Sequence, residues 1–502
     1  MTKQKRLFYY LFVFTTGTAV MMLEFAASRI MAPWFGSSIF VWGNIIGVIL
    51  IALSLGYYMG GRIADKNPQQ SGLMKITLTA GLFTSLIPII STVLMSQTNL
   101  LTAVNSFSLI LSIVGSFMVV LLVFATPICL LGMVSPYVIR LATSSVSEAG
   151  KVAGTLYAVS TIGSIVGTFA SAFVLVPFLG SRETVLLSAT ALILVSVIGY
   201  GNKIWLYGLL LVPLGVYMVF GGTALRANAE MITETETLYQ YVRVQDDGER
   251  LALLFNEGLG TQSYFMKSGV LTGAYYDYLS LIPYLQPLPD NAELLVLGMA
   301  GGTITRQYDK YFPDIDITGV ELDPEVVEIA KEYFALDEQD INIKIGDARN
   351  YVRSSEEKYD IIIIDAYTNE YYIPWHMTTL EFFGELKNVL VDGGVVGFNV
   401  GSFSAESALL QSMIATLYEQ FNYVVIVQIP DTFNYVVMAS DHQFSTTRLQ
   451  DIKDERRSVA NVIYQDINLV TAQDSAMILT DNRAPIEFFT ESMIVDYIKQ
   501  VF

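Results

Sequence analysis

Long apolar stretches fill the first 225 residues of this chain and constrain its fold more than any other feature. A helix needs roughly 20 apolar residues to cross a bilayer. Seven stretches of about this length lie near 7–31, 40–60, 72–95, 106–135, 152–177, 184–200 and 204–222. The first follows Lys3, Lys5 and Arg6, but it is too long for the apolar region of a signal peptide and contains Glu24. The sequence therefore predicts a multi-pass helical domain in the cell membrane over residues 1–225.

Charged residues change sign at the same point of the chain. Residues 1–225 carry 11 Lys and Arg against 4 Asp and Glu, whereas residues 226–502 carry 18 against 43. We therefore expect an acidic, water-soluble part attached to a domain whose partner is the lipid bilayer. An acidic domain does not hold nucleic acid through phosphate contacts. With one Cys and two His in the whole chain, a Cys-based or His-rich metal site is excluded, and we expect no metal.

The side of the membrane that carries the acidic part stays open. The basic clusters precede the first apolar stretch and follow the second, fourth and sixth: Lys3/Lys5/Arg6, Arg62/Lys66/Lys75, Arg140/Lys151 and Lys203. The positive-inside rule makes their side cytoplasmic, so a seventh crossing would place the acidic part outside. Residues 106–139 are long enough to contain an additional short helix, which would reverse this result.

A small β domain is predicted at the start of the acidic part. Residues 226–237 are polar and indicate a linker. From 239 to 265, apolar and polar residues alternate between turn signals, which is typical of an antiparallel meander. A helix is expected at about 272–285. Together these elements define a small domain over residues 238–292.

From residue 293, short apolar runs alternate with helical segments. The expected strands are 294–297, 317–321, 341–345, 360–364 and 395–400, followed by an antiparallel pair at 423–428 and 435–439. This order predicts an α/β Rossmann-like domain over 293–502, with a mainly parallel sheet. Ligands bind at the carboxyl ends of the strands in such sheets.

Glycines and carboxylates follow these strand ends. Gly298, Gly301 and Gly302 form a loop that would let backbone approach a ligand closely. Glu321 ends the second strand, where a carboxylate can bind ribose hydroxyls, and Asp347 ends the third, where it can accept from an adenine amino group. Because the loop differs from G-x-G-x-x-G, an S-adenosyl nucleoside is favoured over a nicotinamide. The alternative is that both carboxylates only cap helices.

Asp365 ends the fourth strand, beside the expected nucleoside site. A carboxylate held there suits a general base. The residues that follow, up to His376, are rich in aromatic side chains. They could cover the site and stack against a cationic sulfonium or amine, or form a surface loop with an apolar underside.

At these residues the sequence resembles the spermidine synthase family of polyamine aminopropyltransferases, over roughly 238–490. It resembles most closely the bacterial multi-pass membrane proteins that carry a spermidine synthase-like C-terminal domain. The resemblance implies a nucleoside site made of Gln240, Gln262, Gly298, Gly301, Gly302, Glu321, Asp347 and Ala348. It implies that Asp365 is the base and that Tyr275 helps to shape the amine site, with Tyr276, Tyr367 and Thr368 as amine-site residues.

The sequence departs from the family pattern at positions that hold cationic groups. Gly301 stands where the family has Asp in its glycine loop, Thr368 replaces the second Asp of Asp-x-x-Asp, and Tyr276 replaces a His. A buried ammonium without a counter-charge is costly. The co-substrate is therefore either decarboxylated S-adenosylmethionine or S-adenosylmethionine itself, whose carboxylate an Asp would repel. A segment over Thr480–Glu487 resembles one that recurs in the membrane-fused subgroup and has no implied role.

The leading hypothesis is a membrane-bound transferase in which Asp365 deprotonates a small-molecule amine that attacks the carbon next to the sulfonium and releases methylthioadenosine. A cytosolic supply of the nucleoside would favour a cytoplasmic site, and a homodimer is possible. One alternative keeps the fold but transfers a methyl group or cleaves S-adenosylmethionine. Another is a non-catalytic domain that senses nucleosides or polyamines on a membrane carrier. The acceptor and any transported solute are left open.

Overall fold

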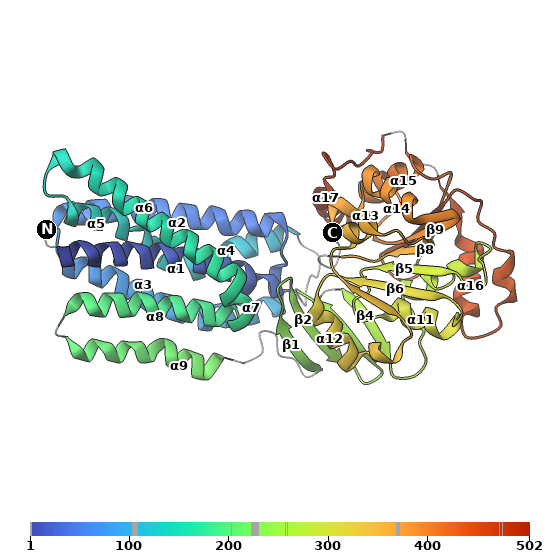
Figure 1. Cartoon of the computed structure of the whole chain (residues 1–502), viewed down its shortest axis with the longest axis horizontal. Coiled ribbons are helices and arrows are strands. Elements are labelled where there is room, and N and C mark those ends of the chain that lie inside the picture. The colour runs from blue at the N-terminus through green and yellow to red at the C-terminus, as the bar shows by residue number, and fades with distance from the viewer. Residues whose placement is uncertain are drawn as a thin grey trace. The chain divides into compact units, whose positions relative to one another are not determined.

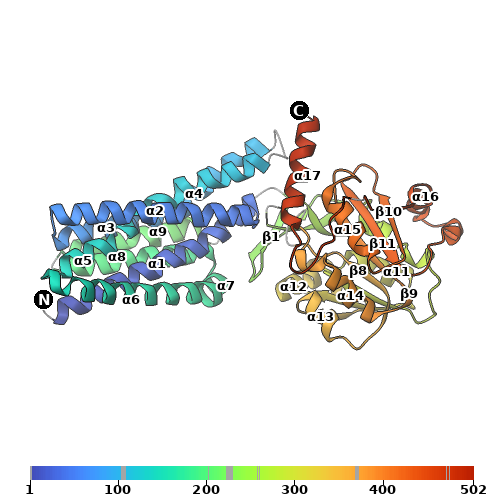
Figure 2. The ribbon, with the colours of Figure 1, turned by 90° about the horizontal axis from the view of Figure 1, so that it is seen from above.

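The chain falls into two compact units, Met1–Ala227 and Asn228–Phe502. The computed structural model describes residues 3–102, 109–201, 203–221, 230–256, 258, 260–367, 372–470, 472–473 and 475–501. Figures 1 and 2 show the course of the chain through each unit.

The first unit is a bundle of roughly aligned helices (Figure 1). Its helices are α1 (Lys3–Phe35), α2 (Ile39–Lys66), α3 (Gln70–Thr102), α4 (Leu109–Gly132), α5 (Val134–Ala142), α6 (Val146–Ala170), α7 (Val176–Leu179), α8 (Ser181–Tyr200) and α9 (Leu211–Phe220). Among the described residues, six helical stretches are long and apolar enough to cross a membrane. The seventh expected stretch is a shorter apolar segment, Ile204–Phe220, made of the 3-10 helix η2 (Ile204–Leu210) and α9.

Glycines allow the closest contacts between these helices. A Cβ added to Gly163 in α6 would lie 2.2 Å from the Phe14 carbonyl oxygen of α1, and one added to Gly56 in α2 would lie 2.2 Å from the Cys129 carbonyl oxygen of α4. Since no real side chain fits at such distances, small residues are required where these backbones meet.

Polar contacts hold one end of the bundle together. Arg140 Nε at the end of α5 donates to Asp65 Oδ1 at the end of α2, over 3.1 Å. Gln70 Nε2 at the start of α3 donates to the Gly199 carbonyl at the end of α8, over 3.1 Å. The basic loops that follow these helices therefore share one end of the bundle, as their alternation in the sequence indicates.

The second unit begins with a small antiparallel sheet, in the order β1-β2-β3-β4. Its strands are β1 (Met231–Glu236), β2 (Tyr241–Asp246), β3 (Arg250–Phe255) and β4 (Thr261–Met266). Residues 231–236, predicted to be part of a linker, are therefore strand β1. It pairs with β2 from Met231 opposite Gln245 to Glu236 opposite Tyr241. This edge strand is held by backbone hydrogen bonds to β2, which do not require apolar side chains. Its sequence is rich in Thr and Glu and therefore lacks the apolar alternation that predicts a strand.

The helix expected at 272–285 is also shorter than predicted. It is divided into α10 (Tyr275–Leu279) and the 3-10 helix η3 (Ile282–Tyr284). Pro283 lies in this second turn, where its missing N–H prevents continuation of an α-helical hydrogen-bond pattern.

The large sheet has the strand order β12-β10-β11-β9-β8-β5-β6-β7. Its strands are β5 (Glu293–Leu297), β6 (Asp316–Glu321), β7 (Asn342–Ile345), β8 (Tyr359–Ile364), β9 (Leu390–Gly401), β10 (Tyr423–Gln428), β11 (Asn434–Ser440) and β12 (Asn468–Leu469). Strands β5 to β9 are parallel, and β10 to β12 are antiparallel additions at one edge. The strand order reverses between β5 and β8, where open sheets of this kind bind ligands.

Helices cover both faces of this sheet. Side chains of α13 (Ala348–Ser354), α14 (Leu380–Val389), α15 (Ala408–Tyr418) and α17 (Ile486–Val501) join one buried core. Those of α10, α11 (Thr303–Tyr311), α12 (Pro324–Tyr333) and α16 (Arg457–Asp466) join the core on the other face. The C-terminal unit is thus a Rossmann-like α/β domain with a small β sheet before it, as predicted.

Candidate active site

A glycine-rich turn connects β5 to α11, and it lies next to Asp365 and Ala366 at the end of β8. Gly298 and Gly302 have φ of 85° and 78°, values that favour glycine. A Cβ on Gly298 would lie 2.8 Å from the Asp365 carbonyl oxygen, and one on Gly301 would lie 2.7 Å from Ser263 Cβ. The absence of side chains therefore lets the loop pack closely against the end of β8 and against β4. The sequence predicts that these glycines allow the close approach of a ligand, whereas the structure explains them by packing within the protein.

Glu321 at the end of β6 is bound to this turn. Its carboxylate accepts from the Ala300 N–H at 2.9 Å and the Asp323 N–H at 3.1 Å, and its side chain is buried. Burial raises the pKa of Glu321 to about 7, although the backbone donors act in the opposite direction. Each carboxylate oxygen can accept more than one hydrogen bond, so Glu321 keeps the further acceptor capacity that its predicted role in ribose binding requires. The cap of α12 is Asp323, which accepts from the Glu325 N–H.

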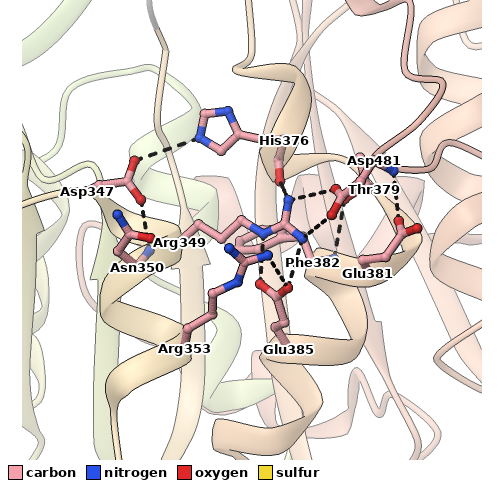
Figure 3. Close-up of polar contacts among 10 residues, drawn as sticks. All are labelled: Asp347, Arg349, Asn350, Arg353, His376, Thr379, Glu381, Phe382, Glu385 and Asp481. Carbon is pink, nitrogen blue, oxygen red and sulfur yellow. Dashed lines mark hydrogen bonds and ion pairs between the residues drawn. The ribbon is translucent and has the colours of Figure 1, made fainter.

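Asp347 follows β7 and caps α13, of which Ala348 is the first residue. Its Oδ1 accepts from the Asn350 N–H at 2.8 Å. Its Oδ2 lies 3.8 Å from His376 Nε2 (Figure 3). Asp347 therefore caps α13 through Oδ1, as the helix-cap alternative predicted. Its second oxygen, Oδ2, takes no part in the cap and lies toward His376.

Asp365 follows β8 and receives hydrogen bonds from two side chains. Tyr275 Oη donates to Oδ2 at 2.8 Å, and Asn399 Nδ2 donates to Oδ1 at 3.2 Å. Asn399 Oδ1 in turn accepts from Asn434 Nδ2 at 2.8 Å, which fixes the orientation of the Asn399 amide. Burial raises the pKa of Asp365 to about 7, and the two donated hydrogen bonds partly oppose that rise.

The other predicted amine-site tyrosines contact the protein backbone. Tyr276 packs its ring 4.0 Å from that of Tyr275, but its hydroxyl donates to the Thr261 carbonyl at 3.1 Å. The Tyr367 hydroxyl donates to the Asn399 carbonyl at 2.7 Å. Tyr367 therefore supports the strand that carries Asn399. Thr368 lies outside the described residues.

A cavity of about 230 Å³ opens beside the donors to Asp365. It is lined by Gly260, Thr261, Gln262, Tyr275, Tyr367, Asn399, Asp431, Thr432, Phe433 and Asn434. Gln262 therefore lies with the predicted amine-site residues. Gln240 lies elsewhere, just after Thr237, whose hydroxyl is 2.5 Å from Asp323 Oδ2 near Glu321. Glu321 and Asp347 do not line this cavity, so the cavity corresponds to the amine half of the predicted site.

A larger hollow of about 630 Å³ opens at the opposite edge of the sheet, around Glu293 and Asp316 at the starts of β5 and β6. It contains none of the predicted site residues, and it lies at the amino ends of parallel strands, where such sheets rarely bind ligands. The smaller cavity is therefore the better candidate.

Several site residues were not identified from the sequence. Asn399 lies in the second half of strand β9, where all residues are buried and the others are apolar or glycine, and a polar residue at such a position could have been recognised as functional. Asp431, Thr432 and Phe433 belong to the turn between β10 and β11. Nothing local in the sequence links that turn to Asp365.

Comparison with known proteins shows what the C-terminal unit is similar to. Residues 274–484 match the spermine/spermidine synthase domain. A probable polyamine aminopropyl transferase of Bifidobacterium longum is 32% identical over 281 residues, which cover 51% of this chain and 61% of that protein. The polyamine aminopropyltransferase 2 of Aquifex aeolicus is 23% identical over 442 residues, which cover 83% of this chain and 84% of that protein. A probable spermidine synthase from Corynebacterium glutamicum, known from its crystal structure, aligns with 50% of this chain and 100% of its own at 20% identity and a TM-score of 0.38.

The extent of these matches differs between the two units. The family domain lies entirely within the C-terminal unit. The alignment with the Aquifex protein is longer than that unit and so continues into the helical bundle. The C-terminal unit therefore contains a match to the spermine/spermidine synthase domain over residues 274–484.

Proposed function

We propose that the C-terminal unit is an aminopropyltransferase that alkylates a small amine with a decarboxylated S-adenosylmethionine co-substrate. The observation that carries this proposal is the placement of Asp365. It ends β8 beside the glycine turn, receives hydrogen bonds from Tyr275 and Asn399, and has a pKa raised to about 7 by burial. Both donors line the 230 Å³ cavity, which would receive the amine.

In the proposed reaction, Asp365 takes a proton from the ammonium of the acceptor. The amine nitrogen then attacks the carbon next to the sulfonium, a C–N bond forms and the C–S bond breaks. The electron pair of the broken bond remains on sulfur, which leaves as neutral methylthioadenosine. Tyr275 and Asn399 hold the carboxylate in place, so the protein contributes mainly by orientation and charge placement. Glu321 would bind the ribose, and Asp347 would bind the adenine.

A second donor, S-adenosylmethionine, is favoured by the surroundings of Gly301. The family has an Asp at this position, but here a Cβ on Gly301 would meet Ser263 Cβ at 2.7 Å. The chain therefore has no room for that counter-charge without moving β4, and a donor that keeps its carboxylate would not be repelled. Methyl transfer from the same nucleoside, and a purely sensory domain, remain the competing functions.

Product analysis separates these candidates. The purified full chain in detergent would be incubated with a diamine and each nucleoside in turn, and the products identified by mass spectrometry. Methylthioadenosine together with a propylamine adduct supports the proposal, and an adduct that retains the carboxylate identifies S-adenosylmethionine as the donor. S-adenosylhomocysteine would show methyl transfer. Nucleoside binding without turnover, unchanged in Asp365→Asn, would identify a sensor.

We propose that the helical bundle anchors this enzyme in the membrane and that Ile204–Phe220 is a seventh crossing. Its 7-residue 3-10 helix and 10-residue α-helix give a length of about 29 Å, close to the thickness of a bilayer core. The C-terminal unit would then lie on the side opposite to the basic loops. An alkaline phosphatase fused after Phe502 should be active outside the cell. An inactive phosphatase, with fluorescence from a cytoplasmic reporter at the same position, would show an even number of crossings.

A further inference from the structure

Near Asp347, the Arg349 guanidinium is the centre of a hydrogen-bonded cluster (Figure 3). We call this cluster the clamp; it consists of Arg349, Glu385, Asp481 and the His376 carbonyl. Its Nε and Nη2 donate to the two oxygens of Glu385, each over 2.8 Å. Its Nη1 and Nη2 donate to the two oxygens of Asp481, over 2.7 and 2.8 Å. The remaining Nη1 hydrogen is donated to the His376 carbonyl at 2.9 Å. All five N–H groups of the buried guanidinium are therefore used.

This clamp joins segments that are distant in the sequence. Arg349 is in the first turn of α13, Glu385 is in α14, and Asp481 belongs to the C-terminal segment that had no role from the sequence. Asp481 Oδ1 also accepts from the hydroxyl of Thr379, the N-cap of α14, at 2.7 Å. The hydrogen bonds with Arg349 lower the pKa of Asp481, which stays ionised. The clamp thus fixes the short helix η5 (Trp375–Met377), which contains His376, against the start of α13.

The His376 ring and Asp347 present complementary polar atoms at a partly open position. His376 Nε2 lies 3.8 Å from Asp347 Oδ2, and the side chains are 33% and 36% exposed. Burial lowers the pKa of His376, so its ring is neutral near pH 7. In the tautomer with its proton on Nε2, the pair offers a carboxylate acceptor beside an N–H donor. A side-chain amide offers the same two functions when it binds the N6 and N7 atoms of adenine.

We propose that His376 is a nucleobase-binding residue that donates to a ring nitrogen of adenine while Asp347 accepts from the adenine amino group. Arg349, Glu385 and Asp481 are positioning residues that hold His376 at this place. The inference rests on the proposed function and adds a specificity element to its donor site. Hypoxanthine, which has an acceptor in place of the amino group, would face the Asp347 carboxylate and be rejected.

The direct test is calorimetric binding of methylthioadenosine and of its 1-deaza and 7-deaza forms to the purified full chain in detergent. The unaltered protein should lose about fivefold in affinity for the form that lacks the nitrogen contacted by His376, the worth of one neutral hydrogen bond. His376→Ala should lower the affinity for methylthioadenosine by a similar factor. This variant should bind the deaza form that lacks the contacted nitrogen as tightly as it binds methylthioadenosine. His376→Gln, which keeps an N–H donor, should recover part of the discrimination.

The chain offers a matched control for this experiment. His442 Nε2 also lies 3.8 Å from a carboxylate oxygen, Oδ1 of Asp392. Asp392 lies near the start of β9, whereas Asn399 of the candidate site lies near the end of that strand. His442→Ala should leave all three affinities unchanged. If the unaltered protein binds both deaza forms as tightly as the parent, or His376→Ala keeps the discrimination, the inference is overturned while the proposed function stands. If the unaltered protein does not bind methylthioadenosine at all, both the inference on His376 and the proposed function are overturned.

The positioning role has its own test. Asp481→Asn removes one charged partner of Arg349 at a side chain that is 34% exposed, so the fold should tolerate the change. We expect the KM for the nucleoside to rise about fivefold, with weaker discrimination between the deaza forms, while kcat at saturating nucleoside is retained. A fall in kcat with unchanged KM and unchanged discrimination would contradict positioning of the nucleobase contact.

Discussion

The two halves of the candidate site hold their carboxylates in different ways. Glu321, in the proposed nucleoside half, receives hydrogen bonds from the backbone N–H groups of Ala300 and Asp323. Asp365, in the proposed amine half, receives them from the side chains of Tyr275 and Asn399. Burial raises the pKa of both carboxylates to about 7. The comparison teaches that two carboxylates with similarly raised pKa values can be held in different ways: backbone donors suit the binding role proposed for Glu321, and side-chain donors suit the catalytic role proposed for Asp365.

The largest expected effect separates the two purposes. Asp365→Asn removes the proton acceptor and keeps the shape of the side chain, so we expect kcat to fall by about 10³-fold. The affinity for methylthioadenosine should stay nearly unchanged, because the proposal assigns nucleoside binding to the other half of the site. Turnover is measured by mass spectrometry of the products and affinity by calorimetry. An equal loss of both quantities would erase the distinction between the halves.

The reciprocal change concerns nucleoside binding. Glu321→Ala removes a charged acceptor for the ribose hydroxyls, so we expect the affinity for methylthioadenosine to fall by about tenfold or more. At saturating nucleoside, kcat should be largely retained. An unchanged dissociation constant would remove Glu321 from the site.

The pH dependence of the amine half can be shifted by one hydroxyl. The proposed base Asp365 can accept a proton only when it is ionised, so kcat/KM should rise with pH up to about 7 and then level off. The hydrogen bond from Tyr275 lowers the pKa of Asp365. Tyr275→Phe should therefore raise it and move the profile to higher pH by about one unit.

Tyr276→Phe is the matched control for that shift. It removes a neighbouring hydroxyl, but this hydroxyl donates to the Thr261 carbonyl and not to Asp365. Its pH profile should coincide with that of the unaltered protein. A profile that moves equally in both variants would show that the shift comes from loosened packing and not from the hydrogen bond.

The smallest effect concerns stability. The folded pKa of Asp365 is about 7, against about 4 in an unfolded chain. Between these values the folded state binds the extra proton, so this group stabilises the fold at low pH and the contribution is lost as pH rises through 7. Asp365→Asn should therefore reduce the fall in Tm between pH 5 and pH 8 by a few degrees. Scanning calorimetry at the two pH values measures this difference, and an unaltered fall would contradict the raised pKa.

The sequence was sufficient for features that depend on local pattern. Apolar runs gave the helical bundle, and alternating strands and helices gave the Rossmann-like sheet. The end of each parallel strand located Glu321, Asp347 and Asp365, because all these ends share one edge of the sheet. Strand β1 was not predicted, because its Thr and Glu residues show no apolar pattern and are ordered by backbone pairing with β2.

What the sequence determined by itself is the environment of each segment, lipid or water, and the edge of the sheet at which chemistry can occur. These follow from hydrophobic periodicity, which acts over a few residues at a time. Only the tertiary structure brought Asn399 to Asp365 and Asp481 to Arg349, pairs that lie 34 and 132 positions apart. Such contacts depend on how strands and helices pack across the whole domain, and no short-range pattern records which distant side chains will meet.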